Sequence, residues 1–133
     1  MVLNKIHGND EKFDGVLVDA PCSCSGTWRR NSEARWIALD QTCQRAAKNQ
    51  LEILKKASAK VKLGGILVYA TCSMSQIENE QVVEKFLDEH SDFSLDPIIH
   101  PLTGEKISGL MTVKSWPENC DAMFAARMIR KKN

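Results

Sequence analysis

The chain has 133 residues, of which 43% are hydrophobic and 26% are charged. This length and composition favour a folded domain with a substantial core and exclude wholesale disorder. Lys and Arg number 18 and Asp and Glu 17, so the net charge of +1 does not indicate a nucleic-acid partner, and any such role must rest on local patches. The apolar runs are too short to span a bilayer, which predicts no membrane partner.

The cysteines indicate the compartment. Their number is odd, they are widely spread, and no apolar leader precedes them, which favours reduced thiols and a cytoplasmic location. Cys22 and Cys24 could begin a metal site, but no second CxxC and no HxxxH follows, so the spacing predicts no metal. The five cysteines are Cys22, Cys24, Cys43, Cys72 and Cys120.

The first predicted element is a short strand over residues 15–18, closed by Asp19. Its residues are apolar on both faces, as in a buried parallel strand. Residues 22–38 mix Ser, Gly, Thr, Arg and Trp without periodicity. They predict a loop that is long enough to be functional or disordered.

Asp40 is a plausible N-cap for a long amphipathic helix that reaches Val61. Gly64 and Gly65 are expected to end this helix, because glycine tolerates a positive φ. Residues 66–71 then form a second buried strand. The apolar face of the helix recurs at steps of three and four through Cys43, Ala46 or Ala47, Gln50, Leu54, Ala57 and Val61.

A second helix is predicted to open at Ser75 and to end near His90. Ser75 and Glu78 have the spacing of a capping box. Glu78 and Glu80 lie in the predicted first turn, where negative charge suits the helix dipole, and that structural role is sufficient for them. Strand, helix, strand and helix in this order predict a right-handed βαβα unit.

The remainder of the chain predicts an antiparallel ending. Residues 93–95 form a short strand and residues 96–108 are loop-like. Residues 110–113 and 122–129 form two further strands, joined by a turn that contains Pro117, Glu118 and Asn119. The fold class is therefore α/β, with parallel strands, crossover helices and a final antiparallel hairpin.

Two cysteines follow the two predicted parallel strands directly. Cys22 comes after the first strand and Cys72 after the second. Ligands of open parallel sheets bind beyond the carboxyl ends of the strands, so we expect both thiols at the ligand-binding edge. Cys43 and Cys120 are instead interpreted as small core residues.

The residues around these cysteines resemble a known family. Residues 19–23 (DAPCS), with the following GTWRR of 26–30, are similar to the Pro-Cys motif of the Sun/Fmu (Nol/Nop/Sun) family. Residues 69–73 (YATCS), followed by ENE at 78–80, resemble that family's Thr-Cys motif. The resemblance covers residues 13–130, and two cysteine motifs about fifty residues apart are far more specific than one.

Members of that family are S-adenosylmethionine-dependent RNA (cytosine-5) methyltransferases that act in bacteria on small-subunit ribosomal RNA. The resemblance implies S-adenosyl-L-methionine as cofactor and RNA as partner. It makes Cys72 the nucleophile that attacks C6 of cytosine, and it gives Cys22 the release of the methylated product. It also places Asp19 and Pro21 against the cofactor. The alternative for Asp19 is a strand-end cap.

Arginines of the long loop are the candidates for RNA contact. Arg29, Arg30 and Arg35 could grip phosphates, while Trp36 is interpreted as packing. The basic residues 127–132 are most simply a solvated chain end, and Asn119 and Cys120 depart from the small residues usual before Asp121 in the family.

The glycine pattern predicts that part of the methyltransferase fold is missing. No glycines fall in a GxGxxG arrangement, so the cofactor loop of a class I methyltransferase is not found. Residues 1–133 are therefore expected to be one partial catalytic domain, the C-terminal half of a Rossmann-like sheet, without the N-terminal RNA-binding domain. Such a fragment would be largely inactive alone. The unpaired edge over residues 16–19 predicts a homodimer or a complementary N-terminal half.

Two other functions compete with this prediction. The chain could be a non-catalytic RNA-binding or assembly module that retains the fold, although such a module has no physical need for both strand-end cysteines. It could also be a redox protein that uses Cys22 and Cys24, although CxC is a strained disulfide pair.

Overall fold

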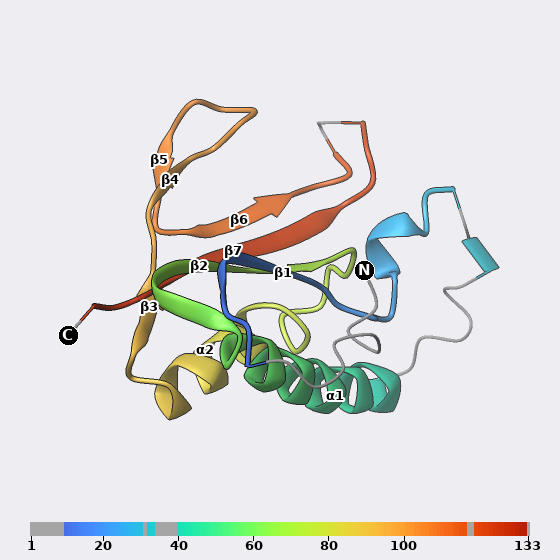
Figure 1. The fold of residues 1–133 in the computed structure, drawn as a ribbon. Coiled ribbons are helices and arrows are strands. Elements are labelled where there is room, and N and C mark those ends of the chain that lie inside the picture. Colours follow the sequence, from blue (N-terminus) through green and yellow to red (C-terminus); the bar gives the residue numbers. More distant parts are fainter. Residues whose placement is uncertain (1–9, 31, 34–39, 117–118, 133) are drawn as a thin grey trace.

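The structure, a computed structural model, describes residues 10–30, 32–33, 40–116 and 119–132. Helices α1 (Asp40–Ser58) and α2 (Glu80–Glu89) lie together on one side of the main sheet (Figure 1). No helix of these ranges is long and apolar enough to cross a bilayer. The main sheet contains β1 (Phe13–Asp19), β2 (Val61–Thr71), β3 (Phe93–Leu95), β6 (Leu110–Val113) and β7 (Met123–Arg130). Two short elements form a separate ribbon, β4 (Ile98–Ile99) and β5 (Lys106–Ile107).

The order of the strands confirms the predicted α/β class. β1 and β2 are parallel and are connected through α1, with Asp19 opposite Ala70. β7 runs antiparallel to β2, and its other edge is shared by β3 and β6. The predicted parallel pair and the antiparallel ending are both present. Among the described residues β1 pairs only with β2, so it forms one edge of the sheet.

The core lies between the sheet and the two helices. Alternate residues of β2 point into it, as the pleat of a strand requires. Burying each large apolar side chain contributes about 1.5–3 kcal/mol relative to exposing it. The large apolar side chains with no exposed surface are Leu54, Leu67, Tyr69, Phe86, Phe124 and Met128.

The predicted end of α1 is wrong. The helix stops at Ser58, where the Ser58 hydroxyl donates to the carbonyl of Lys55, and β2 already begins at Val61. Gly64, expected at the helix end, instead adopts φ +77° inside the strand, where the pairing with β1 is irregular. A bulge and a helix C-terminus both require positive φ, so the glycine alone could not distinguish them.

The predicted capping box of α2 is also wrong. The helix begins at Glu80, after a turn in which the backbone N–H groups of Glu78 and Asn79 both donate to the carbonyl of Ser75. The Glu78 carboxylate accepts hydrogen bonds from other parts of the chain, so it does not cap this helix.

Three further expectations need correction. Arg127 pairs with Asp96 at 2.7 Å and Arg130 pairs with Asp92 at 2.9 Å, so these arginines fasten β7 to the β3 region and are not a solvated chain end. The loop expected over 96–108 contains the short ribbon of β4 and β5. The thiols of Cys43 and Cys120, expected in the core, are only partly buried.

Candidate active site

The parallel pairing of β1 and β2 brings the two predicted thiols together. The pairing continues past Asp19, because the N–H of Ala20 donates to the carbonyl of Ala70 at 2.9 Å. The segments that follow β1 and β2 then leave the sheet at the same edge, and the sulfur atoms of Cys22 and Cys72 lie 3.2 Å apart. The predicted convergence of the two strand-end cysteines is therefore confirmed.

A third thiol joins this pair. The sulfur of Cys24 lies 3.9 Å from that of Cys22. Cys24 has φ 58° and ψ 25°, a left-handed conformation that is uncommon for a residue other than glycine. Its carbonyl accepts hydrogen bonds from both the N–H and the hydroxyl of Thr27, which hold this backbone in place.

The site keeps its two central thiols protonated. Burial raises the pKa of Cys72, and its contacts with Cys22 and Cys24 raise it further. Burial also raises the pKa of Cys22, and the hydrogen bond with Cys72 offsets only part of this effect. A thiol must lose its proton to act as a nucleophile, so a bound substrate or an added base has to favour the thiolate.

The side chain of Glu78 connects the loop of Cys22 with the loop of Cys72. Its side chain is fully buried, and its carboxylate accepts four hydrogen bonds. From the loop of Cys22 come the N–H and the hydroxyl of Ser23, at 2.8 and 2.6 Å. From the loop of Cys72 comes the hydroxyl of Ser73 at 2.6 Å, and from α1 the amide of Gln50 at 3.1 Å. The carboxylate therefore fixes the spacing of the two thiols.

This role of Glu78 was not predicted from the sequence, where its position indicated an interaction with the dipole of α2. One signal was available: Glu78 stands four residues before Val82 and eight before Phe86, which places it on the buried face of a helical pattern. A carboxylate on such a face requires hydrogen-bond donors, because burying an unpaired charge is costly. The serines that supply them come from distant positions.

Gly26 lies between the segment that follows β2 and the segment that precedes β7. Its N–H donates to the carbonyl of Cys72 at 2.8 Å, and its carbonyl accepts from the N–H of Ala122 at 2.9 Å. A Cβ at this position would lie 2.6 Å from the carbonyl oxygen of Cys72 and would also collide with the carbonyl of Ala122. Only a residue without a side chain allows this close approach.

Asp19 and Pro21, the predicted cofactor contacts, lie at the same edge. Both are exposed, and Asp19 has no partner among the described residues. The carbonyl of Pro21 accepts a hydrogen bond from the Gln50 amide at 2.9 Å, so the backbone before Cys22 is anchored on α1. An exposed, unpaired carboxylate at the sheet edge where the thiols lie fits a cationic or hydroxyl-bearing ligand.

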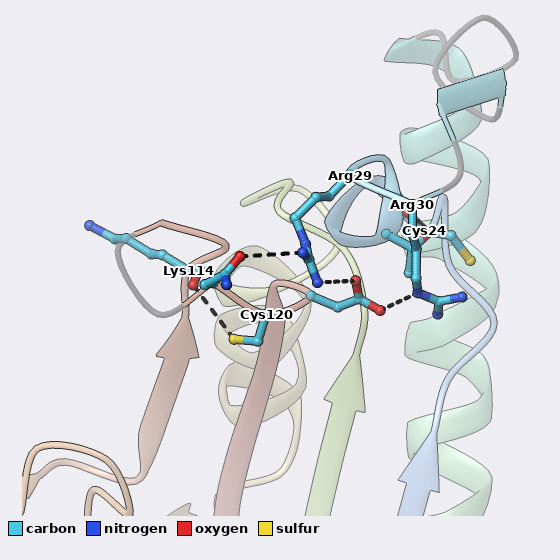
Figure 2. A network of polar contacts seen from close by, with 8 residues as sticks. Cys24, Arg29, Arg30, Lys114 and Cys120 are labelled. Carbon is cyan, nitrogen blue, oxygen red and sulfur yellow. Dashed lines mark hydrogen bonds and ion pairs between the residues drawn. The ribbon is translucent and has the colours of Figure 1, made fainter.

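The predicted RNA-contacting arginines are partly paired. Figure 2 shows Arg29 and Arg30 extending from their loop toward the segment that carries Cys120. Nε of Arg30 lies 2.6 Å from the Asp121 carboxylate, and Arg29 donates to the side chain of Asn119 at 3.4 Å. Both arginines remain substantially exposed. Arg35 and Trp36 lie outside the described residues.

Comparison with known proteins identifies the class to which this fold and thiol pair belong. The family model described as 16S rRNA methyltransferase RsmB/F matches residues 2–129. The chain belongs to this family. It is 37% identical over 122 residues to Ribosomal RNA small subunit methyltransferase B from Yersinia pseudotuberculosis and from Yersinia pestis.

Solved structures share the fold. PH0851 is 35% identical with a TM-score of 0.81, and the alignment covers 90% of this chain and 26% of that one. A methyltransferase homolog protein from Pyrococcus horikoshii is 27% identical with a TM-score of 0.72, covering 91% and 40%. NSun6 from Pyrococcus horikoshii, solved with SFG, is 24% identical with a TM-score of 0.75, covering 94% and 32%.

The matched part is a fraction of each relative. The alignment to the Yersinia proteins covers 92% of this chain and 27% of theirs. The chain therefore spans about a quarter of the length of the curated relatives that it matches.

Proposed function

We propose that this chain carries the catalytic cysteines of an S-adenosyl-L-methionine-dependent RNA (cytosine-5) methyltransferase that acts on small-subunit ribosomal RNA. The 3.2 Å distance between the sulfur atoms of Cys22 and Cys72 is the observation that carries the proposal. Membership of the 16S rRNA methyltransferase RsmB/F family supports it.

The chemistry explains why two thiols are needed. C5 of cytosine is a poor nucleophile. Addition of the Cys72 thiolate to C6 forms a C–S bond and makes C5 nucleophilic enough to take the methyl group. S-adenosyl-L-methionine would supply that methyl group as an electrophile. Loss of the C5 proton to a base then restores the double bond and expels the Cys72 thiolate. Cys22 acts in this release step.

The surrounding residues prepare this reaction. The Glu78 carboxylate holds the loops of Cys22 and Cys72 at a fixed spacing, which provides the orientation that covalent catalysis needs. Asp19 faces the ligand at the carboxyl end of β1. Burial and the neighbouring thiols raise the pKa of Cys72, so the bound substrate has to favour its thiolate. Arg29 and Arg30 would contact RNA phosphates.

The exposed edge of β1 is the proposed docking position for the rest of the catalytic domain. β1 pairs only with β2 among the described residues, and an unpaired edge offers its backbone groups to another strand. We assign the remainder of the cofactor pocket to that additional part, or to a second copy of the chain that adds a strand at the same edge.

A chimera tests the proposed activity. This chain would replace the matching segment of the Yersinia pseudotuberculosis methyltransferase, and methyl transfer to small-subunit ribosomal RNA would be measured with a labelled cofactor. We expect incorporation into cytosine C5, abolished by Cys72→Ala and unaffected by Cys43→Ala. Retained activity in the Cys72→Ala chimera would show that the nucleophile is another residue, and methylation at another atom would contradict the cytosine-5 chemistry.

A further inference from the structure

The three thiols at the strand ends form a group that the methyl-transfer chemistry does not need in full. Cys72 and Cys22 have roles in that reaction, whereas Cys24 has none. Yet all three sulfur atoms lie within 4.8 Å of one another. We propose that Cys22, Cys24 and Cys72 bind a thiophilic divalent cation, with Zn²⁺ as the fitting ion.

The spacing of the sulfur atoms suits one ion. Zinc binds thiolate sulfur at about 2.3 Å, so two sulfurs of a tetrahedral site lie about 3.8 Å apart. The distance from Cys22 to Cys24 is 3.9 Å and that from Cys22 to Cys72 is 3.2 Å. The sulfur atoms of Cys24 and Cys72 lie within 4.8 Å of each other, so every pair is within about 1 Å of the tetrahedral spacing. The fourth position is open to water, as in zinc sites with three protein ligands.

The backbone holds the third ligand in place. Cys24 keeps a left-handed conformation that residues other than glycine adopt rarely, and such conformations are concentrated at functional positions. The hydrogen bond from Thr27 to its carbonyl holds this turn, and the hydrogen bond from Gly26 to the carbonyl of Cys72 ties the two loops together. The ligands are therefore arranged before any ion binds.

Charge and proton balance are also consistent with the site. Each thiol gives up its proton to solvent as its sulfur binds, so one Zn²⁺ exchanges for roughly three protons and the site has a net charge of −1. Because thiol protons compete with the ion, binding should tighten as the pH rises.

Sequence spacing concealed this site. Cys22 and Cys24 alone lack a partner motif, and the third ligand is contributed by Cys72, fifty residues away and delivered by the parallel pairing of β1 and β2. A bound ion would also occupy both proposed catalytic sulfurs and stop methyl transfer reversibly. That consequence rests on the proposed function, whereas ion binding does not.

The test measures ion binding directly on the reduced, chelator-stripped chain. Zn²⁺ affinity would be determined by competition with a chromogenic chelator, and Co²⁺ would report its ligands through sulfur-to-cobalt charge-transfer absorption. We expect a single site. Cys24→Ser should weaken Zn²⁺ binding at least tenfold and lower the charge-transfer intensity by about one third, one of three thiolates. Cys43→Ser, which changes a partly buried thiol outside the group, should leave both unchanged.

Cys24→Gly is the second variant, because glycine accepts the left-handed conformation and should fold at least as well as the parent chain. Equal Zn²⁺ affinity in the parent, Cys24→Ser and Cys24→Gly chains would overturn the proposal. So would equal losses in Cys24→Ser and Cys43→Ser. Neither result depends on methylation, so failure of the metal site and failure of the proposed function are distinguishable.

Discussion

Removing the Glu78 carboxylate tests the account of how the two cysteine loops are held. In Glu78→Ala the N–H of Ser23 and one N–H of the Gln50 amide lose their acceptor inside the protein. Neither donor can reverse its role. An unsatisfied buried donor costs about 1–3 kcal/mol; this applies in full to the buried Gln50 amide and in part to the half-buried Ser23 N–H, so we expect Glu78→Ala to lower the free energy of unfolding by at least ~1–3 kcal/mol before any cavity is counted.

Glu78→Gln should cost less, because its carbonyl oxygen can replace the oxygen that accepts from Ser23 N–H and Gln50. Its amide then faces the hydroxyls of Ser23 and Ser73, which can accept as well as donate. What remains is the difference between charged and neutral hydrogen bonds, ~1–2 kcal/mol. The order of stability is therefore parent, then Glu78→Gln, then Glu78→Ala.

Urea unfolding followed by circular dichroism measures this order. Glu84→Gln is the matched control, because Glu84 is exposed on α2, the helix that follows Glu78, and it should change stability by no more than about 0.5 kcal/mol. If Glu78→Ala were as stable as Glu84→Gln, or Glu78→Gln less stable than Glu78→Ala, the hydrogen-bond reasoning would be refuted.

Three more predictions follow from the same structure. The raised pKa of Cys72 means that the folded chain holds this proton more tightly than the unfolded chain. The resulting contribution to stability is complete below about pH 8.5 and is lost as the pH rises above it. The free energy of unfolding of Cys72→Ser should therefore decline less steeply above that pH than the free energy of unfolding of the parent chain. Gly26→Ala should destabilise the chain by about 1–3 kcal/mol in thermal unfolding, because its Cβ would meet two backbone carbonyls, whereas Gly15→Ala has open space and should cost much less. Leu17 is 63% exposed on β1 and should support association between copies of the chain, so sedimentation should show weaker self-association in Leu17→Lys than in Leu102→Lys, which changes a 60% exposed leucine away from that edge. Equal effects of the two substitutions would reject β1 as the site where a second copy docks.

The sequence predicted those parts of the fold that depend on local patterns. The apolar runs of β1 and β2 and the position of Cys22 and Cys72 after them were sufficient to place two thiols at one edge of a parallel sheet. The ends of the helices and strands were harder to predict from the sequence. Gly64 suits a helix end and a bulge equally, and only pairing with β1 decided between them.

The part of the site that could not be predicted depends on contacts between distant residues. Ser75 and Glu78 have the spacing of a capping box, but the Glu78 carboxylate instead accepts hydrogen bonds from Ser23 and Gln50, which are distant in the sequence. Arg30 was expected to be available to RNA, yet it pairs with Asp121, which is 91 residues away in the chain. Cys24 lies in the thiol group because its backbone adopts a left-handed conformation, which the sequence did not indicate.

Trapping of the covalent intermediate tests the central claim most directly. The chimera with the Yersinia methyltransferase would be incubated with ribosomal RNA and cofactor and analysed on a denaturing gel. Cys22→Ala should accumulate an RNA–protein adduct, because addition of Cys72 proceeds and release stalls, and the added substitution Cys72→Ala should remove that adduct. An adduct that persists without Cys72, or none in the Cys22→Ala protein, would contradict the roles assigned to the two thiols.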